Sequence, residues 1–129
     1  MAILSQATDP QHPAVTAEAI PARVFVCVRA SDLSGKVRVA TNAEEDVAGL
    51  LGFAPKSASA EKSILLYRDG DVVPGFTGLT PGQEYHLNVS SLALASALTA
   101  GTWTKKVGLA RSSTHLELSF GRMVSQTKP

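Results

Sequence analysis

Short runs of β-favouring residues alternate with turn signals along most of this 129-residue chain, and this alternation constrains the fold more than any other feature. The turn signals recur close to every ten residues, which leaves room for about eight short strands. They include Ser34-Gly35, Asp69-Gly70, Pro74-Gly75, Pro81-Gly82 and Gly121. Many short strands joined by turns are typical of an all-β sandwich or barrel. We therefore predict a single small β-sandwich or β-barrel, jelly-roll or β-tulip-like, with an extended N-terminal arm.

The hydrophobic pattern distinguishes two kinds of strand. Arg23–Arg29 is β-branched or aromatic on both faces, so it should be buried on both sides of a sheet. Lys36–Thr41 and Glu84–Val89 alternate apolar and polar residues, as half-buried strands do. Thr102–Ala110 and Thr114–Phe120 should pair as the closing strands. The side chains expected in the core are those of Phe25, Val37, Leu65, Tyr85, Leu87, Leu109, Leu116 and Leu118.

Two turns carry specific structural predictions. Asp69-Gly70 has the sequence of a tight type I′ hairpin turn, which would join Ser63–Tyr67 to Asp71–Val73. Pro81-Gly82 suits a type II turn, because proline fits its second position and glycine fits the third, where φ is positive.

The segment between residues 42 and 54 allows two interpretations. Asn42 with Glu45 resembles a helix capping box, but the glycines that follow disfavour a helix. We favour a turn at Asn42–Asp46 followed by a strand at Val47–Ala54, with a short helix as the alternative.

The chain divides near residue 22. Residues 1–22 contain prolines at positions 10, 13 and 21 among isolated apolar residues, so this arm should be extended. It is either a tail or a segment that becomes ordered on a partner. Residues 23–121 then form the β-domain, and residues 122–129 form a short C-terminal tail.

Composition excludes several classes of function. The formal net charge is +1, whereas nucleic-acid and acidic-lipid partners require a concentrated positive field, so we expect neither nucleic acid nor membrane as a partner. The amino terminus has neither the basic region nor the long apolar run of a secretory signal. One cysteine, Cys27, allows no internal disulfide, and it should be a small core residue rather than a nucleophile. We expect a protein that stays in a reducing compartment.

The residues give no support for catalysis. His12, His86 and His115 lie far apart in the sequence and lack metal-ligand spacing. Asp69-Gly70-Asp71 lacks the further ligands of a calcium loop, and nucleophile-elbow and phosphate-binding motifs do not occur. We therefore assign no catalytic, cofactor-binding or metal-binding residue and predict that the protein is not an enzyme.

One surface feature stands out near the end of the chain. Trp103 lies between threonines and is followed by Lys105 and Lys106. The tryptophan either caps the core or anchors an interface, since Trp is enriched among the residues that dominate binding energy.

The carboxy-terminal half contains a distinctive series of turn and strand segments, namely Gly78–Leu87 (GLTPGQEYHL), Leu98-Thr99, Gly101–Trp103, Val107–Ala110 and Leu116–Leu118. This series resembles a small β-module of tailed bacteriophages. In such modules a GLTPG-x-x-Y-x-L turn and strand precedes a VG-x-A strand and a final alternating strand. The middle segment, Val47–Ala54 with its following loop and strand, is similar to small phage capsid cement proteins, and together the resemblance covers about residues 37–120. This sequence departs from the pattern of the phage module at His86, where a second aromatic residue is common, and at Lys105-Lys106.

This resemblance implies a structural virion protein that binds the outer surface of a phage capsid and stabilises the lattice of the major capsid protein. It would be made in the host cytoplasm and would form a homo-oligomer, with a trimer favoured over a dimer. A structural or receptor-binding domain of a head fibre or tail fibre is the main alternative, and a small barrel-type enzyme or ligand carrier is a third. The residues expected to touch the capsid or another partner are Ile3, Leu4, Val15, Phe76, Trp103, Lys105 and Lys106.

Overall fold

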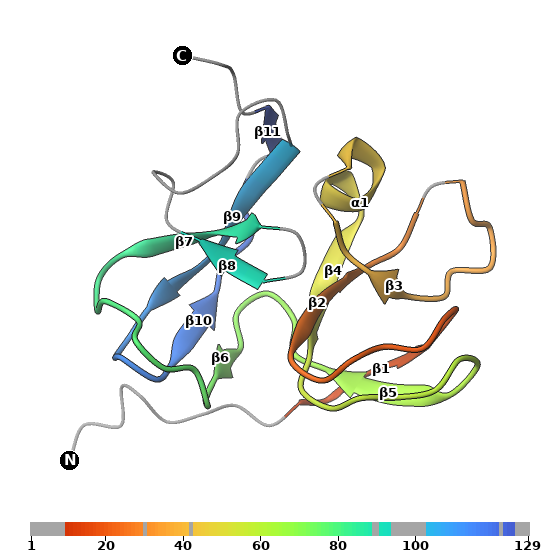
Figure 1. Ribbon diagram of the computed structural model, residues 1–129, viewed down its shortest axis with the longest axis horizontal. Helices are drawn as coiled ribbons and strands as arrows, with labels where there is room; N and C mark the ends of the chain where they lie inside the picture. Colours follow the sequence, from red (N-terminus) through yellow and green to blue (C-terminus); the bar gives the residue numbers. More distant parts are fainter. Residues whose placement is uncertain are drawn as a thin grey trace.

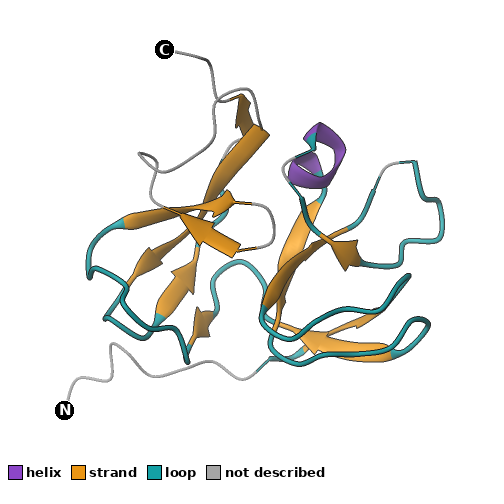
Figure 2. Cartoon of the chain, in the orientation of Figure 1, coloured by secondary structure: helices purple, strands orange, loops and turns teal. Residues whose placement is uncertain are grey.

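The computed structural model describes residues 10–29, 31–41, 43–88, 91–93, 103–121 and 123–125. These residues contain eleven strands and one short helix, with the strands arranged in three antiparallel sheets (Figures 1 and 2). The all-β prediction is confirmed. None of the sheets in the described part closes into a barrel, so the fold is sandwich-like.

The largest sheet contains the second half of the chain, on the left in Figure 1. Its strand order is β6-β10-β9-β7-β8, and β11 also pairs with β9. The predicted closing pair is confirmed, because β9 and β10 are antiparallel with Leu116 opposite Ala110. The strands are β6 (Val72–Val73), β7 (Glu84–Asn88), β8 (Ser91–Ala93), β9 (Trp103–Ala110), β10 (Leu116–Leu118) and β11 (Met123–Ser125).

The first half of the chain forms two smaller sheets. A three-stranded sheet has the order β3-β2-β4, and a two-stranded sheet consists of β1 and β5. The elements are β1 (His12–Val15), β2 (Val24–Cys27), β3 (Arg38–Val39), helix α1 (Glu44–Ala48), β4 (Leu50–Ala54) and β5 (Ser63–Leu66).

Strand β2 lies between two hydrophobic clusters. Phe25 and Cys27 belong to the main cluster, which the large sheet shares, whereas Val24 and Val26 belong to a second cluster beneath β1–β5. Successive residues of a strand point to opposite faces, so β2 contributes alternately to the two clusters. All four residues are buried, which confirms the two-sided burial predicted for this strand.

Two residues predicted for the core are placed wrongly. Leu65 is 52% exposed, because Leu66 and Ile64 on the same strand face the second cluster and the strand's alternation turns Leu65 outward. Leu109 is only half-buried, because its neighbours Gly108 and Ala110 occupy the buried face of β9. The other predicted core residues, namely Phe25, Val37, Tyr85, Leu87, Leu116 and Leu118, are buried.

Residues 12–20, part of the predicted N-terminal arm, pair with and pack against the rest of the described fold. β1 is extended, as Pro13 predicts, but it pairs with β5 along its length. Thr16 then forms a bridge to Val37, and Ile20 is 2% exposed within the second cluster. Apolar side chains and backbone hydrogen bonds together fix this segment in the fold. Residues 1–9 and 126–129 lie outside the described residues.

The hairpin predicted at Asp69-Gly70 does not form. A turn exists there, closed by the Asp71 amide donating to the Arg68 carbonyl, but only Gly70 has positive φ, whereas a type I′ turn requires it at both central residues. The flanking strands belong to different sheets: β5 pairs with β1, and β6 pairs with β10. The turn therefore carries the chain from the smaller sheets to the large one.

The structure of residues 43–54 agrees in part with each of the two interpretations, because a short helix is followed by a strand. Helix α1 occupies Glu44–Ala48, where we favoured a turn, and β4 begins at Leu50 rather than Val47. The helix ends at Gly49, and its N-cap residue, Ala43, makes no side-chain capping bond. The capping residue predicted at Asn42 lies outside the described residues. Within the described chain, no helix is long and apolar enough to cross a membrane.

Candidate interaction site

The residues predicted to contact a partner come from separate segments of the fold. Ile3 and Leu4 lie outside the described residues. Val15 is on β1, Phe76 follows β6, and Trp103, Lys105 and Lys106 are on β9. These three regions differ in burial and in their polar contacts.

Val15 lies on an exposed apolar surface, the outer face of β1–β5, which we define by Pro13, Val15, Ser63 and Leu65. Pro13 is directly opposite Leu65, and Val15 is directly opposite Ser63, so the four side chains share one face of the two-stranded sheet. Val15 is 40% exposed, and Leu65 is exposed to a still greater degree. A pocket of about 290 Å³ adjoins this face and is lined in part by Pro10, Pro55, Ile64 and Leu65.

The sequence explains why this face is apolar. β5 carries three consecutive apolar residues, Ile64, Leu65 and Leu66, and a strand with one buried face must turn at least one of them outward. Proline is tolerated on an edge strand because it lacks the amide donor that a central strand needs, and Pro13 lies on such a strand.

Phe76 is half-buried and forms part of an aromatic pocket of about 280 Å³. Its ring centroid lies 5.5 Å from that of Phe53, which in turn contacts Phe25 edge-on at 4.9 Å. The guanidinium carbon of Arg23 lies 4.7 Å from the Phe76 ring centroid and 5.2 Å from that of Phe53. The aromatic pocket is lined by Arg23, Phe25, Phe53, Phe76, Thr77, Gly78, Leu79 and Tyr85.

Arg23 is held in place by both its side chain and its backbone. Its Nη2 donates to the Pro74 carbonyl at 2.9 Å, and its amide donates to the Ala54 carbonyl at 2.8 Å. Its φ of 59° is a left-handed conformation, which costs a non-glycine residue on the order of 1–3 kcal/mol. The strained backbone thus coincides with the residue whose guanidinium lies against two phenylalanine rings at the pocket.

The β9 segment is more closely tied to the protein itself. Trp103 is half-buried against the main cluster, which favours the interpretation that it caps the core. Lys106 Nζ lies 3.3 Å from Glu84 Oε2, so this lysine has an ion-pair partner on β7. Burial lowers the pKa of Lys105. Of the three regions, β9 therefore offers the fewest unengaged groups to a partner.

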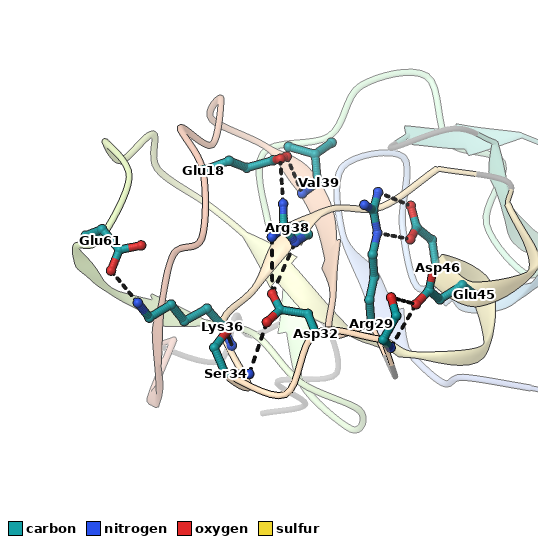
Figure 3. Close-up of polar contacts among 11 residues, drawn as sticks. Glu18, Arg29, Asp32, Ser34, Lys36, Arg38, Val39, Glu45, Asp46 and Glu61 are labelled. Carbon is teal, nitrogen blue, oxygen red and sulfur yellow. Dashed lines mark hydrogen bonds and ion pairs between the residues drawn. The ribbon is translucent and has the colours of Figure 1, made fainter.

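The loop between β2 and β3 carries the most exposed large apolar residue of the described chain. Leu33 is 96% exposed, and we name residues 31–36 the Leu33 loop. Asp32 fixes the loop internally, because its Oδ1 accepts from the Ser34 amide at 3.0 Å and its Oδ2 accepts from Arg38 Nη2 at 3.2 Å (Figure 3). Hydrogen bonds from Ser34 and from Arg38 lower the pKa of the Asp32 carboxyl.

A second set of polar contacts joins the start of this loop to α1 (Figure 3). The Ser31 amide donates to Glu45 Oε1 at 2.9 Å, and the Ser31 hydroxyl bonds to the same oxygen. At the other end of the loop, Lys36 forms an ion pair with Glu61. The Leu33 loop is therefore fastened on both sides of its exposed leucine.

Of the side chains that could act as a nucleophile or a metal ligand, Cys27, His12 and His115 are engaged within the fold, whereas the buried Nδ1 of His86 has no hydrogen-bond partner among the described residues. Burial, followed by the nearby Asp46 carboxylate, raises the pKa of Cys27 to about 12, which suppresses the thiolate form. His12 Nε2 lies 3.9 Å from Asp71, and His115 Nδ1 lies within hydrogen-bonding distance of Ser112 and Thr114. Among the described residues, no group of histidine, cysteine and carboxylate side chains could hold a metal ion.

The sequence interpretation missed Arg23 and Leu33. Leu33 is an isolated large apolar residue in a polar turn segment, and that isolation is the signal that could have identified it. Arg23 is the first residue of the predicted strand Arg23–Arg29, and the neighbouring sequence gives no signal that its φ is positive. No protein-family model matches the chain, and no curated protein matches it.

Proposed function

We propose that this protein is a structural virion protein that binds the outer surface of a phage capsid and stabilises the lattice of the major capsid protein. The proposal rests on two supports of different kinds. One is the resemblance of residues 37–120 to phage cement and fibre modules. The other is the outer face of β1–β5, the observation that carries the proposal.

This outer face suits contact with a protein surface. Pro13, Val15 and Leu65 present apolar area to solvent, and such area gains free energy when it is removed from water. The described chain begins beside it, since Pro10 lines the adjoining pocket. The amino-terminal residues Ile3 and Leu4, predicted as capsid contacts, therefore precede this same region in the chain.

A cementing role requires only modest affinity at each site. Specific interfaces typically bury about 800 Å² per partner. Binding to the assembled lattice stabilises it by mass action, about 2.7 kcal/mol per site when the free protein is at a hundredfold excess over Kd. The same stabilisation is added at every junction between capsid subunits that a copy of the protein occupies.

Heat resistance of phage heads tests the proposal. Heads of the phage that encodes the chain, stripped of this protein, should rupture at a lower temperature than complete heads, and adding the purified protein should restore them. Leu65→Asp should fail to restore them, because it places a charge in the apolar contact. Ser113→Asp adds the same charge on an exposed loop of the large sheet and should restore them fully.

The fibre alternative draws on the same resemblance, because the GLTPG module also occurs in head and tail fibres. If stripped heads resist heat as well as complete heads do, cementing is excluded. Immunogold labelling of virions would then distinguish a fibre position from the capsid surface.

A further inference from the structure

The Leu33 loop presents a large apolar side chain to solvent. A single exposed leucine is ordinary on a protein surface and needs no explanation by itself. Here, however, polar contacts on both sides of Leu33 fix the loop that presents it, so little further conformational entropy is lost when the leucine is buried by a partner. The same chain also carries an open apolar pocket.

The aromatic pocket is large enough for this side chain. Its volume is about 280 Å³, whereas a cavity of roughly 150 Å³ already accommodates benzene. Phe25, Phe53 and Leu79 provide apolar walls, and the exposed residues Thr77 and Gly78 leave its mouth open.

The charges around the two features are also complementary. Arg23 lines the pocket, and within the described part of the chain it forms no ion pair with a carboxylate. The ion-paired groups around Leu33 carry one net negative charge, because the carboxylates of Glu18, Asp32 and Glu61 face only two cations, Arg38 and Lys36. A docked loop would therefore bring net negative charge towards the Arg23 guanidinium. Opposite charges at the rim of an interface favour one register of docking over others.

Leu33 does not fill the pocket of its own chain. Arg23, which lines the pocket, immediately precedes β2, and the Leu33 loop follows this strand, so Arg23 and Leu33 lie at opposite ends of β2. Leu33 is also almost fully exposed within its own chain. A pocket that receives Leu33 therefore belongs to another molecule.

We propose that copies of this chain associate head to tail, with Leu33 of one copy inserted into the aromatic pocket of the next. This inference extends the homo-oligomer that the phage resemblance implies, and it uses surfaces separate from the outer face of β1–β5. Each copy then provides one leucine and one pocket. A contact of this kind is heterologous, and it leaves no unfilled pocket only when the copies close into a ring, as in a trimer.

Sedimentation velocity over a range of protein concentrations tests the inference. The wild-type chain should form a concentration-dependent oligomer. Leu33→Asp should raise the dissociation constant at least about tenfold, because it replaces a buried leucine with a charge. Thr77→Trp should do the same by filling the mouth of the pocket without removing a core residue. Leu65→Asp is the matched control, since it makes the same replacement on the outer face of β1–β5 and should leave self-association unchanged.

Mixing the two defective variants gives the sharper result. A Leu33→Asp copy keeps its pocket and a Thr77→Trp copy keeps its leucine, so the mixture should form one-to-one dimers and nothing larger. Circular dichroism melting of each variant establishes that it is folded. A wild-type chain that is monomeric at all concentrations, or an oligomer that Leu33→Asp leaves intact, overturns the inference.

Failure of this inference can be told apart from failure of the proposed function. Capsid binding that depends on Leu65 while the free protein stays monomeric overturns only head-to-tail association. An oligomer that depends on Leu33 but does not bind phage heads overturns only the capsid role.

Discussion

Arg29 Nε donates to Asp46 Oδ1 at 2.7 Å, and the Asp46 carboxylate is only 1% exposed (Figure 3). The other carboxylate oxygen accepts from the amide and the hydroxyl of Thr41, at 3.0 and 2.8 Å. Asp46 lies on α1, Arg29 follows β2 and Thr41 follows β3. One carboxylate thus fastens the helix to the three-stranded sheet.

Asp46→Asn should lower the free energy of unfolding by about 1–3 kcal/mol at pH 7, because buried donors lose a charged acceptor. Burial raises the pKa of Asp46, but hydrogen bonds from Arg29 and Thr41 outweigh it, so its pKa lies below the usual value. A depressed pKa stabilises the fold above the unfolded-state pKa, near pH 4, and this contribution disappears as pH falls through the folded-state value. Urea unfolding should therefore show the variant and wild type converging as the pH falls below about 4. Glu117→Gln, at an exposed ion pair with Arg111, should cost less than about 1 kcal/mol, and an equal loss in both variants would contradict this account.

Cys27 should be inert in the folded protein. Its side chain is fully buried, and its pKa of about 12 leaves almost no thiolate at neutral pH. A thiol reagent should react only when the chain unfolds, so the reaction should become rapid above the urea midpoint. Rapid modification in native buffer would show that the β2 region opens readily.

Leu116→Ala should lower the free energy of unfolding by about 2–5 kcal/mol, because the residue is fully buried in the main cluster and truncation leaves a cavity. Leu65→Ala removes the same atoms from an exposed position and should cost much less. Chemical denaturation of the two variants makes the comparison. Similar losses would mean that the outward orientation of Leu65 is wrong.

Truncation tests how much residues 10–20 contribute to the stability of the fold. The chain that lacks residues 1–9 is the reference for the melting temperature. Deleting residues 1–20 should lower it markedly, because this removes β1, the buried Ile20, and Thr16, whose hydroxyl donates to the Ser59 carbonyl at 2.7 Å. Equal melting temperatures for the two truncations would show that residues 10–20 do not stabilise the fold.

Local patterns predicted those parts of the fold that local physics determines. Pro81-Gly82 forms the predicted turn, with the Gln83 amide donating to the Thr80 carbonyl and Gly82 at a φ of 85°. Two-sided burial of β2 was equally predictable, because every residue in it is apolar. In these places the sequence neighbourhood alone decides the conformation.

Contacts between residues far apart in the sequence determine the features of the fold that local patterns did not predict. Asp69-Gly70 forms a turn, but the Gly70 amide donates to the Leu118 carbonyl and the Leu118 amide to that of Asp71, so the chain after the turn joins the large sheet instead of folding back on β5. Nothing in the run Ile64–Leu66 indicates which leucine faces inward, because adjacent apolar residues fit either register. The aromatic pocket is assembled from residues 23–85, and no local pattern reveals it.

The position of β2 between two clusters restricts how this chain can diverge in evolution. Val24 and Val26 must fit one set of neighbours while Phe25 and Cys27 fit another, so a change in volume at any of them disturbs a packed interior. Surface loops such as residues 55–62 carry no such double constraint. Distant descendants of this fold should therefore be recognisable by four consecutive small or aromatic apolar residues in this central strand, long after the loops around it have lost all similarity.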